Sequence, residues 1–184
     1  MTKRIGLIAD NHSRTADGSD VPDEVLAAFK GVDLIVHCGD AGSWGTLDRL
    51  ETIAPVIAVE GGHNGVGADP RVGGFGRVEM IDGLRVGIVH DLVRQGVAKE
   101  MTEQIEFAGE PAARFVKLFG GPIDVLLYAG THRPQIGSAD GVFMVNPGSP
   151  TLADGRGPGK LGHVAVVELA DGVAMARVID LATV

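Results

Sequence analysis

The segment Ile5–His12, with the sequence IGLIADNH, decides the fold of this chain. It is an apolar run of strand length that ends in three polar residues, Asp10, Asn11 and His12. Carboxylate and imidazole groups bind divalent transition metals, and the ends of neighbouring strands gather such side chains into one pocket. The segment therefore predicts a strand with metal ligands at its carboxyl end.

Three more apolar runs end in, or are followed by, residues of the same kind: Leu34–His37 before Gly39-Asp40, Arg85–His90, and Val125–Tyr128 before Thr131-His132. Gly-Asp pairs also occur in ordinary turns, so independent turn or capping residues are the alternative interpretation. That alternative is weakest for Asp10, His12, Asp40 and His132, and stronger for His90. The repetition at successive strand ends favours one shared metal site.

Short strand-like runs alternate with helix-compatible segments along the first half of the chain. The predicted strands are Ile5–Ala9, Leu34–His37, Val56–Val59, Arg85–His90 and Val125–Tyr128. The predicted helices are Pro22–Phe29, Thr46–Ile53 and Glu110–Phe119. This alternation is typical of an α/β fold with parallel pairing. Later strands are predicted at Val142–Val145, His163–Leu169 and Val173–Ile179, where turns such as Asp171-Gly172 favour antiparallel pairing.

Composition limits the class of protein. The 184 residues, 45% of them hydrophobic, suffice for one sizeable core, so residues 1–184 are expected to form a single domain. The net charge of −8 argues against stable binding of nucleic acid, because phosphate contacts need basic patches. Cys38 is the only cysteine, and no long apolar stretch follows the first residues. These features predict a cytoplasmic protein without disulfides, signal peptide or membrane-spanning helix.

The order and spacing of the motifs resemble the calcineurin-like metallophosphoesterase superfamily, in particular its small prokaryotic phosphodiesterase branch. The resemblance covers nearly the whole chain, through IGLIADNH, LIVHCGD, VIAVEGGHN, VGIVH, LLYAGTHRPQI and VNPGSPT. It implies a four-layer α/β/β/α sandwich, in which two facing β-sheets are flanked by helices.

The same resemblance, carried over motif by motif, implies the metal ligands. It places the ligands of a first metal ion at Asp10, His12, Asp40 and His132. For a second ion it leaves only Asp40, as a bridging ligand, and His90.

Two positions depart from the family's pattern. Gly62 stands where the family has an asparagine ligand, and Gly130 stands where it has the first histidine of its G-H-x-H motif. Compensation by Asn64 or Asp91 is an open alternative. The resemblance therefore implies one firm metal site and a weakened second one.

His63 falls on the family's catalytic histidine, which acts on the leaving oxygen. Its usual acidic partner is replaced by Asn64. Because an amide stabilises a charged imidazole less than a carboxylate does, we expect His63 to be a weaker acid-base group. For His37 and His163, which fall in predicted strands, a hydrogen-bonded structural role is the simpler interpretation.

The resemblance implies metal-dependent hydrolysis of a phosphodiester or phosphomonoester by a metal-activated water, with activity reduced by Gly62 and Gly130. Manganese is the preferred cofactor, with iron, zinc and nickel as alternatives. A small phosphoester substrate and no membrane partner are expected, and a homo-oligomer is compatible with the sequence. The alternative is a weakly active or inactive scaffold, because a eukaryotic retromer subunit uses a similar fold and metal pocket mainly to bind other proteins.

Overall fold

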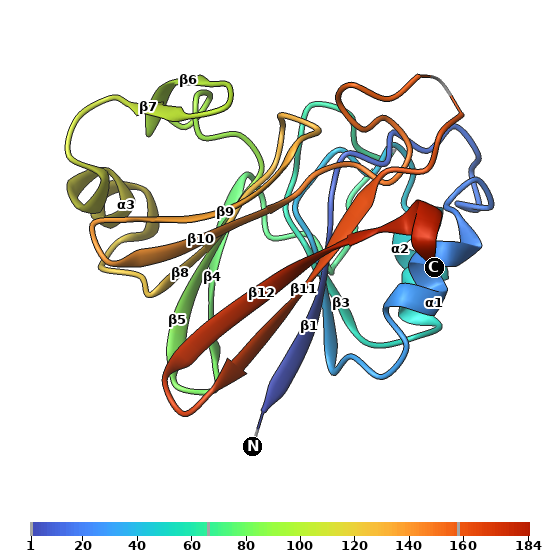
Figure 1. Ribbon diagram of the computed structural model, residues 1–184, viewed down its shortest axis with the longest axis horizontal. Coiled ribbons are helices and arrows are strands. Elements are labelled where there is room, and N and C mark those ends of the chain that lie inside the picture. Colours follow the sequence, from blue (N-terminus) through green and yellow to red (C-terminus); the bar gives the residue numbers. More distant parts are fainter. Residues whose placement is uncertain (1, 66, 158) are drawn as a thin grey trace.

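The computed structural model describes residues 2–65, 67–157 and 159–184. Figure 1 shows two facing sheets with helices on their outer sides. The strands of the first sheet, in spatial order, are β12 (Val173–Asp180), β11 (His163–Ala170), β1 (Lys3–Ile8), β2 (Leu34–His37) and β3 (Val56–Ala58). Those of the second are β4 (Gly76–Ile81), β5 (Leu84–Val89), β8 (Val125–Leu127), β10 (Val142–Pro147) and β9 (Pro134–Ala139). This is the predicted two-sheet sandwich.

The first sheet combines parallel and antiparallel strands. β1, β2 and β3 are parallel, whereas β11 runs antiparallel to both β1 and β12. Helices α1 (Asp23–Ala28) and α2 (Gly45–Glu51) cover the outer face. Residues of both helices and of the strands form one apolar cluster there, which includes Val25, Leu47, Leu50, Ile35 and Val56. Among the described residues, no helix has the length and apolar character needed to cross a membrane.

The second sheet has a parallel centre, β5-β8-β10, and antiparallel edges, β4 and β9. Helix α3 (Pro111–Phe119) and the hairpin of β6 (Ala98–Met101) and β7 (Ile105–Phe107) lie on its outer side. Phe115 and Phe119 of α3 pack there with Leu126 and Met144. The expectation of antiparallel pairing for Val142–Val145 is therefore wrong in part. This strand is β10, which lies between β8 and the edge strand β9. It pairs in parallel with β8 and antiparallel with β9.

Four strands were not predicted from the sequence: β4, β6, β7 and β9. The edge strands β4 (GRVEMI) and β9 (PQIGSA) carry charged, small or polar residues at half or more of their positions and are half-buried or exposed along their length. Their own propensity for strand structure is low, so pairing with a buried neighbour forms them. Sequence patterns detect the central strands because these bury both faces.

The inner faces of the two sheets form the central core. Leu7 of β1, Val36 of β2, Val86 of β5 and Leu127 of β8 belong to it, and all four are fully buried. Because the sheets pack face to face, the loops that follow β1 and β2 meet the loops that follow β5 and β8. The fold thus brings all the predicted ligand motifs to one end of the sandwich.

Leu127→Ala is expected to lower the free energy of unfolding by about 2–5 kcal/mol, because it leaves a cavity between the sheets. Met175→Ala is the matched control on β12, where the side chain is 59% exposed, and its effect should stay below about 0.5 kcal/mol. Urea unfolding measures both. Equal losses in the two variants would contradict a solid inter-sheet core.

His37, the last residue of β2, links the loops that follow β1 and β2. Its side chain is fully buried. Nε2 lies 2.9 Å from Asn11 Oδ1, and Nδ1 accepts a hydrogen bond from the Gly39 N–H at 3.2 Å. These contacts fit a neutral imidazole with a structural role, and burial lowers the pKa of His37 to about 3.

The free energy of unfolding of the metal-free protein should fall as the pH drops from about 6.5 towards 3. In the unfolded chain His37 takes up a proton near its ordinary pKa of 6.5, whereas the folded protein resists protonation down to about pH 3. Protonation therefore favours the unfolded state in this window. His37→Gln should flatten the dependence of unfolding free energy on pH, and an unchanged slope would contradict this explanation.

Candidate metal centre

The residues at the strand ends adopt an uncommon backbone conformation. Asp10, His12, Asp40 and His132 have φ angles of 56°, 49°, 56° and 57°. Left-handed backbone is rare for residues other than glycine and persists where the surroundings enforce it. The Asp10 N–H donates to the Gly39 carbonyl at 3.0 Å, and the His12 N–H donates to the Asp40 carbonyl at 2.9 Å. The loops after β1 and β2 thus fix each other.

Two buried polar residues brace these loops from the second half of the chain. Ser149 Oγ donates to the Asp10 carbonyl at 2.8 Å, and Asn146 Nδ2 donates to Thr131 Oγ1 at 3.1 Å. Both side chains are fully buried. The part played by Ser149 could not be inferred from the sequence, because it and Asp10 are 139 positions apart.

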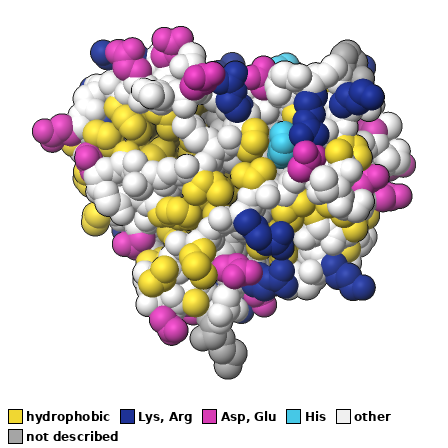
Figure 2. Space-filling view, in the orientation of Figure 1, with side chains coloured by type: hydrophobic (Ala, Val, Ile, Leu, Met, Phe, Trp, Pro, Cys, Tyr) yellow, Lys and Arg dark blue, Asp and Glu magenta, His cyan; other side chains and the backbone are white. Residues whose placement is uncertain are grey.

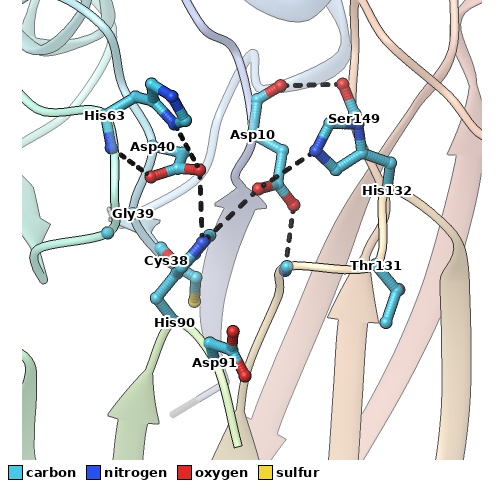
Figure 3. A network of polar contacts seen from close by, with 12 residues as sticks. Asp10, Cys38, Gly39, Asp40, His63, His90, Asp91, Thr131, His132 and Ser149 are labelled. Atoms are coloured by element: carbon cyan, nitrogen blue, oxygen red, sulfur yellow. Dashed lines mark hydrogen bonds and ion pairs between the residues drawn. The ribbon is translucent and has the colours of Figure 1, made fainter. Parts of the chain in front are cut away.

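The structure brings together all five residues predicted as metal ligands, and Figure 3 shows several of them pointing inward. The ligand atoms of Asp10, His12 and His132 lie within 4.8 Å of one another, as do those of Asp10, Asp40 and His90. His12 Nε2 is 3.3 Å from His132 Nε2 and 3.5 Å from Asp40 Oδ2. Asp10 Oδ1 is 3.6 Å from His132 Nε2 and 3.7 Å from His90 Nε2. The two groups share Asp10 and form one continuous centre.

Backbone carbonyls orient two of the histidines. His90 Nδ1 donates to the Cys38 carbonyl at 2.7 Å, and His132 Nδ1 donates to the Leu152 carbonyl at 2.9 Å. In each ring the hydrogen bond places a proton on Nδ1, so that in the neutral ring the Nε2 lone pair is directed into the centre. Metal-binding histidines commonly have such a second partner.

The Asp10 carboxylate provides the test of whether the site fits a cation. Its Oδ2 accepts a hydrogen bond from the Gly130 N–H at 3.1 Å, whereas the buried Oδ1 has no hydrogen-bond partner in the described part of the chain. Burial raises the pKa of Asp10. A buried carboxylate oxygen without a donor is costly, and a bound cation offsets that cost. The donor set therefore fits a divalent metal ion.

Asp40 has the opposite electrostatic character. Burial raises its pKa, but hydrogen bonds from His90 and from the His63 N–H outweigh burial and hold the pKa of Asp40 well below its usual range. Burial alone would lower the pKa of His90. The charges of Asp40 and Asp10 outweigh burial, so the pKa of His90 is raised overall. Asp40 is thus a charged carboxylate whose Oδ2 lies within 3.5 Å of nitrogens of His12, His63 and His90.

His63 lies at the open side of the centre. Its N–H donates to Asp40 Oδ1 at 2.7 Å, its Nδ1 is 3.4 Å from Asp40 Oδ2, and its side chain is 71% exposed. Asn64 does not orient this imidazole. The Asn64 amide instead exchanges hydrogen bonds with the backbone of Gly61, at 2.9 and 3.1 Å. Asp40 therefore takes the position of the acidic partner of His63.

Neither of the two compensating residues considered above reaches the centre. The amide of Asn64 is hydrogen-bonded to the backbone of Gly61. Asp91 Oδ1 accepts hydrogen bonds from the backbone N–H groups of Val93 and Arg94. In Figure 3, Asp91 lies below the cluster, and no drawn contact joins it to Asp10 or Asp40. Of the residues predicted as ligands for a second ion, the described part of the chain therefore provides Asp40 and His90, and neither Asn64 nor Asp91 adds to them.

A cleft of about 580 Å³ opens above the centre. It is lined by His12, Ser13, Arg14, Gly42, Gly62, His63, Asn64 and Leu152. The cleft gives a ligand access to His12 and His63, so the centre is not a closed structural metal site.

Comparison with known proteins gives the family. A family model, the calcineurin-like phosphoesterase superfamily domain, matches residues 4–172. A probable metallophosphoesterase of Methanothermobacter thermautotrophicus is 35% identical over 151 residues, which cover 80% of this chain and 77% of that protein.

Two solved structures share the fold. An archaeal phosphodiesterase is 19% identical with a TM-score of 0.63, and the match covers 96% of this chain and 99% of that one. The Vps29 protein of Entamoeba histolytica in complex with zinc is 20% identical with a TM-score of 0.61, over 97% of this chain and 99% of that one. The family match and the 35% identical Methanothermobacter protein show that the chain belongs to the calcineurin-like phosphoesterase superfamily.

Proposed function

We propose that this protein hydrolyses phosphoesters with a divalent metal ion held by Asp10, His12, Asp40 and His132. The observation that carries the proposal is the clustering of their donor atoms, in groups within 4.8 Å, below an open cleft. Membership in the superfamily supports the reaction class. A small phosphodiester or phosphomonoester is the proposed substrate.

A bound divalent ion supplies Lewis acidity towards a phosphoryl oxygen and lowers the pKa of water. The chain's own residues do the rest. Asp40 holds its negative charge where three imidazoles converge and orients His63 through Nδ1. The exposed ring of His63 then stands in the cleft, where it donates a proton to the leaving oxygen.

Manganese is the proposed cofactor, with iron, zinc and nickel as alternatives, because mixed imidazole and carboxylate donors suit all four. The zinc complex of the structurally similar Vps29 supports this ligand type. One ion is held firmly. Near a second ion the donors are Asp40 and His90, with Asp10 already shared with the first group. These are too few protein ligands to hold a second ion tightly without help from water or substrate oxygens.

A scaffold function is the second candidate. Figure 2 shows apolar side chains over the face formed by β9 and β12. There Ile136 is 41%, Val173 is 58% and Met175 is 59% exposed. Surfaces of this kind often bind other proteins. The enzyme remains the better proposal, because the open cleft leads directly to the ligand cluster, and hydrolysis assays separate the two.

Metal addition is expected to stabilise the protein. At a free Mn²⁺ concentration 100 times the dissociation constant, the free energy of unfolding should rise by about 2.7 kcal/mol relative to metal-free protein. Asp10→Asn should abolish most of this gain, because it removes the buried charge. Elemental analysis should find about one tightly held ion per chain. If Mn²⁺ does not stabilise the protein and no metal is retained after dialysis against Mn²⁺, the proposed site is contradicted.

Asp40→Ala is expected to reduce Mn²⁺-dependent hydrolysis of an aryl phosphodiester by at least about 100-fold, because this carboxylate contacts both halves of the centre. Glu100→Ala, at an exposed position on β6, is the control and should hydrolyse at the wild-type rate. Steady-state assays measure both variants. Undiminished turnover in Asp40→Ala would refute the proposed function.

A further inference from the structure

A guanidinium group lies beside Gly62, a residue of the cleft wall. A Cβ atom added at residue 62 would be 3.2 Å from Arg94 Nη1, 3.6 Å from Nη2 and 3.7 Å from Cζ. The next residue is His63, whose N–H donates to Asp40 Oδ1 at 2.7 Å. The missing side chain at Gly62 thus leaves the space that the Arg94 guanidinium approaches.

The turn that follows β5 holds Arg94 in this position. Asp91 Oδ1 accepts hydrogen bonds from the N–H groups of Val93 at 2.7 Å and Arg94 at 3.1 Å. His90, one of the predicted ligands, directly precedes this turn, so the loop that carries His90 also carries Arg94. The position of Arg94 is therefore set by the same strand end as the metal centre.

The guanidinium itself is not used to hold the fold. Within residues 2–65, 67–157 and 159–184, the hydrogen bond from Arg94 N–H to Asp91 is the one that Arg94 makes, and its side chain joins no ion pair. By contrast, Arg71, Arg77, Arg133 and Arg156 all pair with carboxylates. An arginine beside a metal centre, with its donors uncommitted, is suited to bind an anion.

We propose that the Arg94 guanidinium binds the phosphoryl oxygens of the substrate beside a single metal ion, in the space that the absence of a side chain at residue 62 leaves open. The inference rests on the proposed phosphoesterase function. Guanidinium binds two phosphate oxygens at once and stays charged at all physiological pH values. Arg94 is thus a substrate-binding group that supplies positive charge on the side of the centre where protein ligands for a second ion are few.

The test measures the affinity of the Mn²⁺-loaded full-length protein for inorganic phosphate by calorimetry. Arg94→Gln should weaken phosphate binding by about 10- to 100-fold, the loss expected for a bidentate charge-assisted contact. Arg94→Lys should recover part of the affinity, because lysine keeps the charge but not the planar fork. Arg177→Gln, at an exposed arginine on β12, is the matched control and should bind phosphate like the wild type. Mn²⁺ affinity and melting temperature should not change in any variant.

A second variant tests the role of Gly62. The backbone there lies outside the left-handed region, so a larger residue is tolerated locally. Gly62→Val offers no metal ligand and must displace the guanidinium. Gly62→Val should weaken phosphate binding when Arg94 is present. In the Arg94→Gln background it should cause no further loss, because both substitutions remove the same contact.

The outcomes separate this inference from the function on which it rests. Weaker phosphate binding in Arg94→Gln with unchanged Mn²⁺ affinity supports the inference. Wild-type phosphate affinity in Arg94→Gln, together with Mn²⁺-dependent hydrolysis, overturns the inference and leaves the proposed function standing. A loaded wild-type protein that neither binds phosphate nor hydrolyses esters overturns both.

Discussion

The metal centre depends on a carboxylate that the fold has removed from water. Asp10 is fully buried, and among the described residues its Oδ1 has no hydrogen-bond donor. An uncompensated buried charge costs several kcal/mol, and a cation within bonding reach removes that cost. The Nε2 atoms of His132 and His90 approach this oxygen from two sides, at 3.6 and 3.7 Å. The other candidate ligands are thus arranged around a carboxylate oxygen whose burial is unfavourable unless a cation is bound.

The packing of the two sheets makes this arrangement possible. Asp10 and Asp40 follow strands of the first sheet, while His90 and His132 follow strands of the second. No single sheet holds a full set of ligands, so the apolar core between the sheets determines the distances at the centre. The left-handed backbone at Asp10, Asp40 and His132 stores strain, of order 1–3 kcal/mol per residue, that only this surrounding structure sustains. Stability of the core and integrity of the site are therefore coupled.

The sequence was sufficient to predict the central strands and the ligand types, because buried strands and terminal Asp and His residues leave strong local patterns. It was insufficient wherever a side chain's partner is distant in the chain. Asn64 looked like a partner for His63 or a substitute ligand, but its amide is occupied by Gly61. No local sequence pattern marks Arg94, because its position beside Gly62 depends on the turn that Asp91 holds. The edge strands β4 and β9 of the second sheet lack a strong local pattern for the same reason, since pairing with their neighbours forms them.

Backbone geometry at Gly62 and Gly130 supports the proposal of a single firm ion. Gly130 has a φ of 90°, and its N–H donates to Asp10 Oδ2, so a ligand side chain at this position would sit on strained backbone. At Gly62 the nearest side-chain group is already a cation. Under the proposed function, a chain with a net charge of −8 has to attract an anionic substrate to its centre. Arg14 in the cleft wall and Arg94 beside Gly62 supply positive charge locally, which under the proposed function would steer a phosphoester to the centre although the molecule as a whole repels an anion.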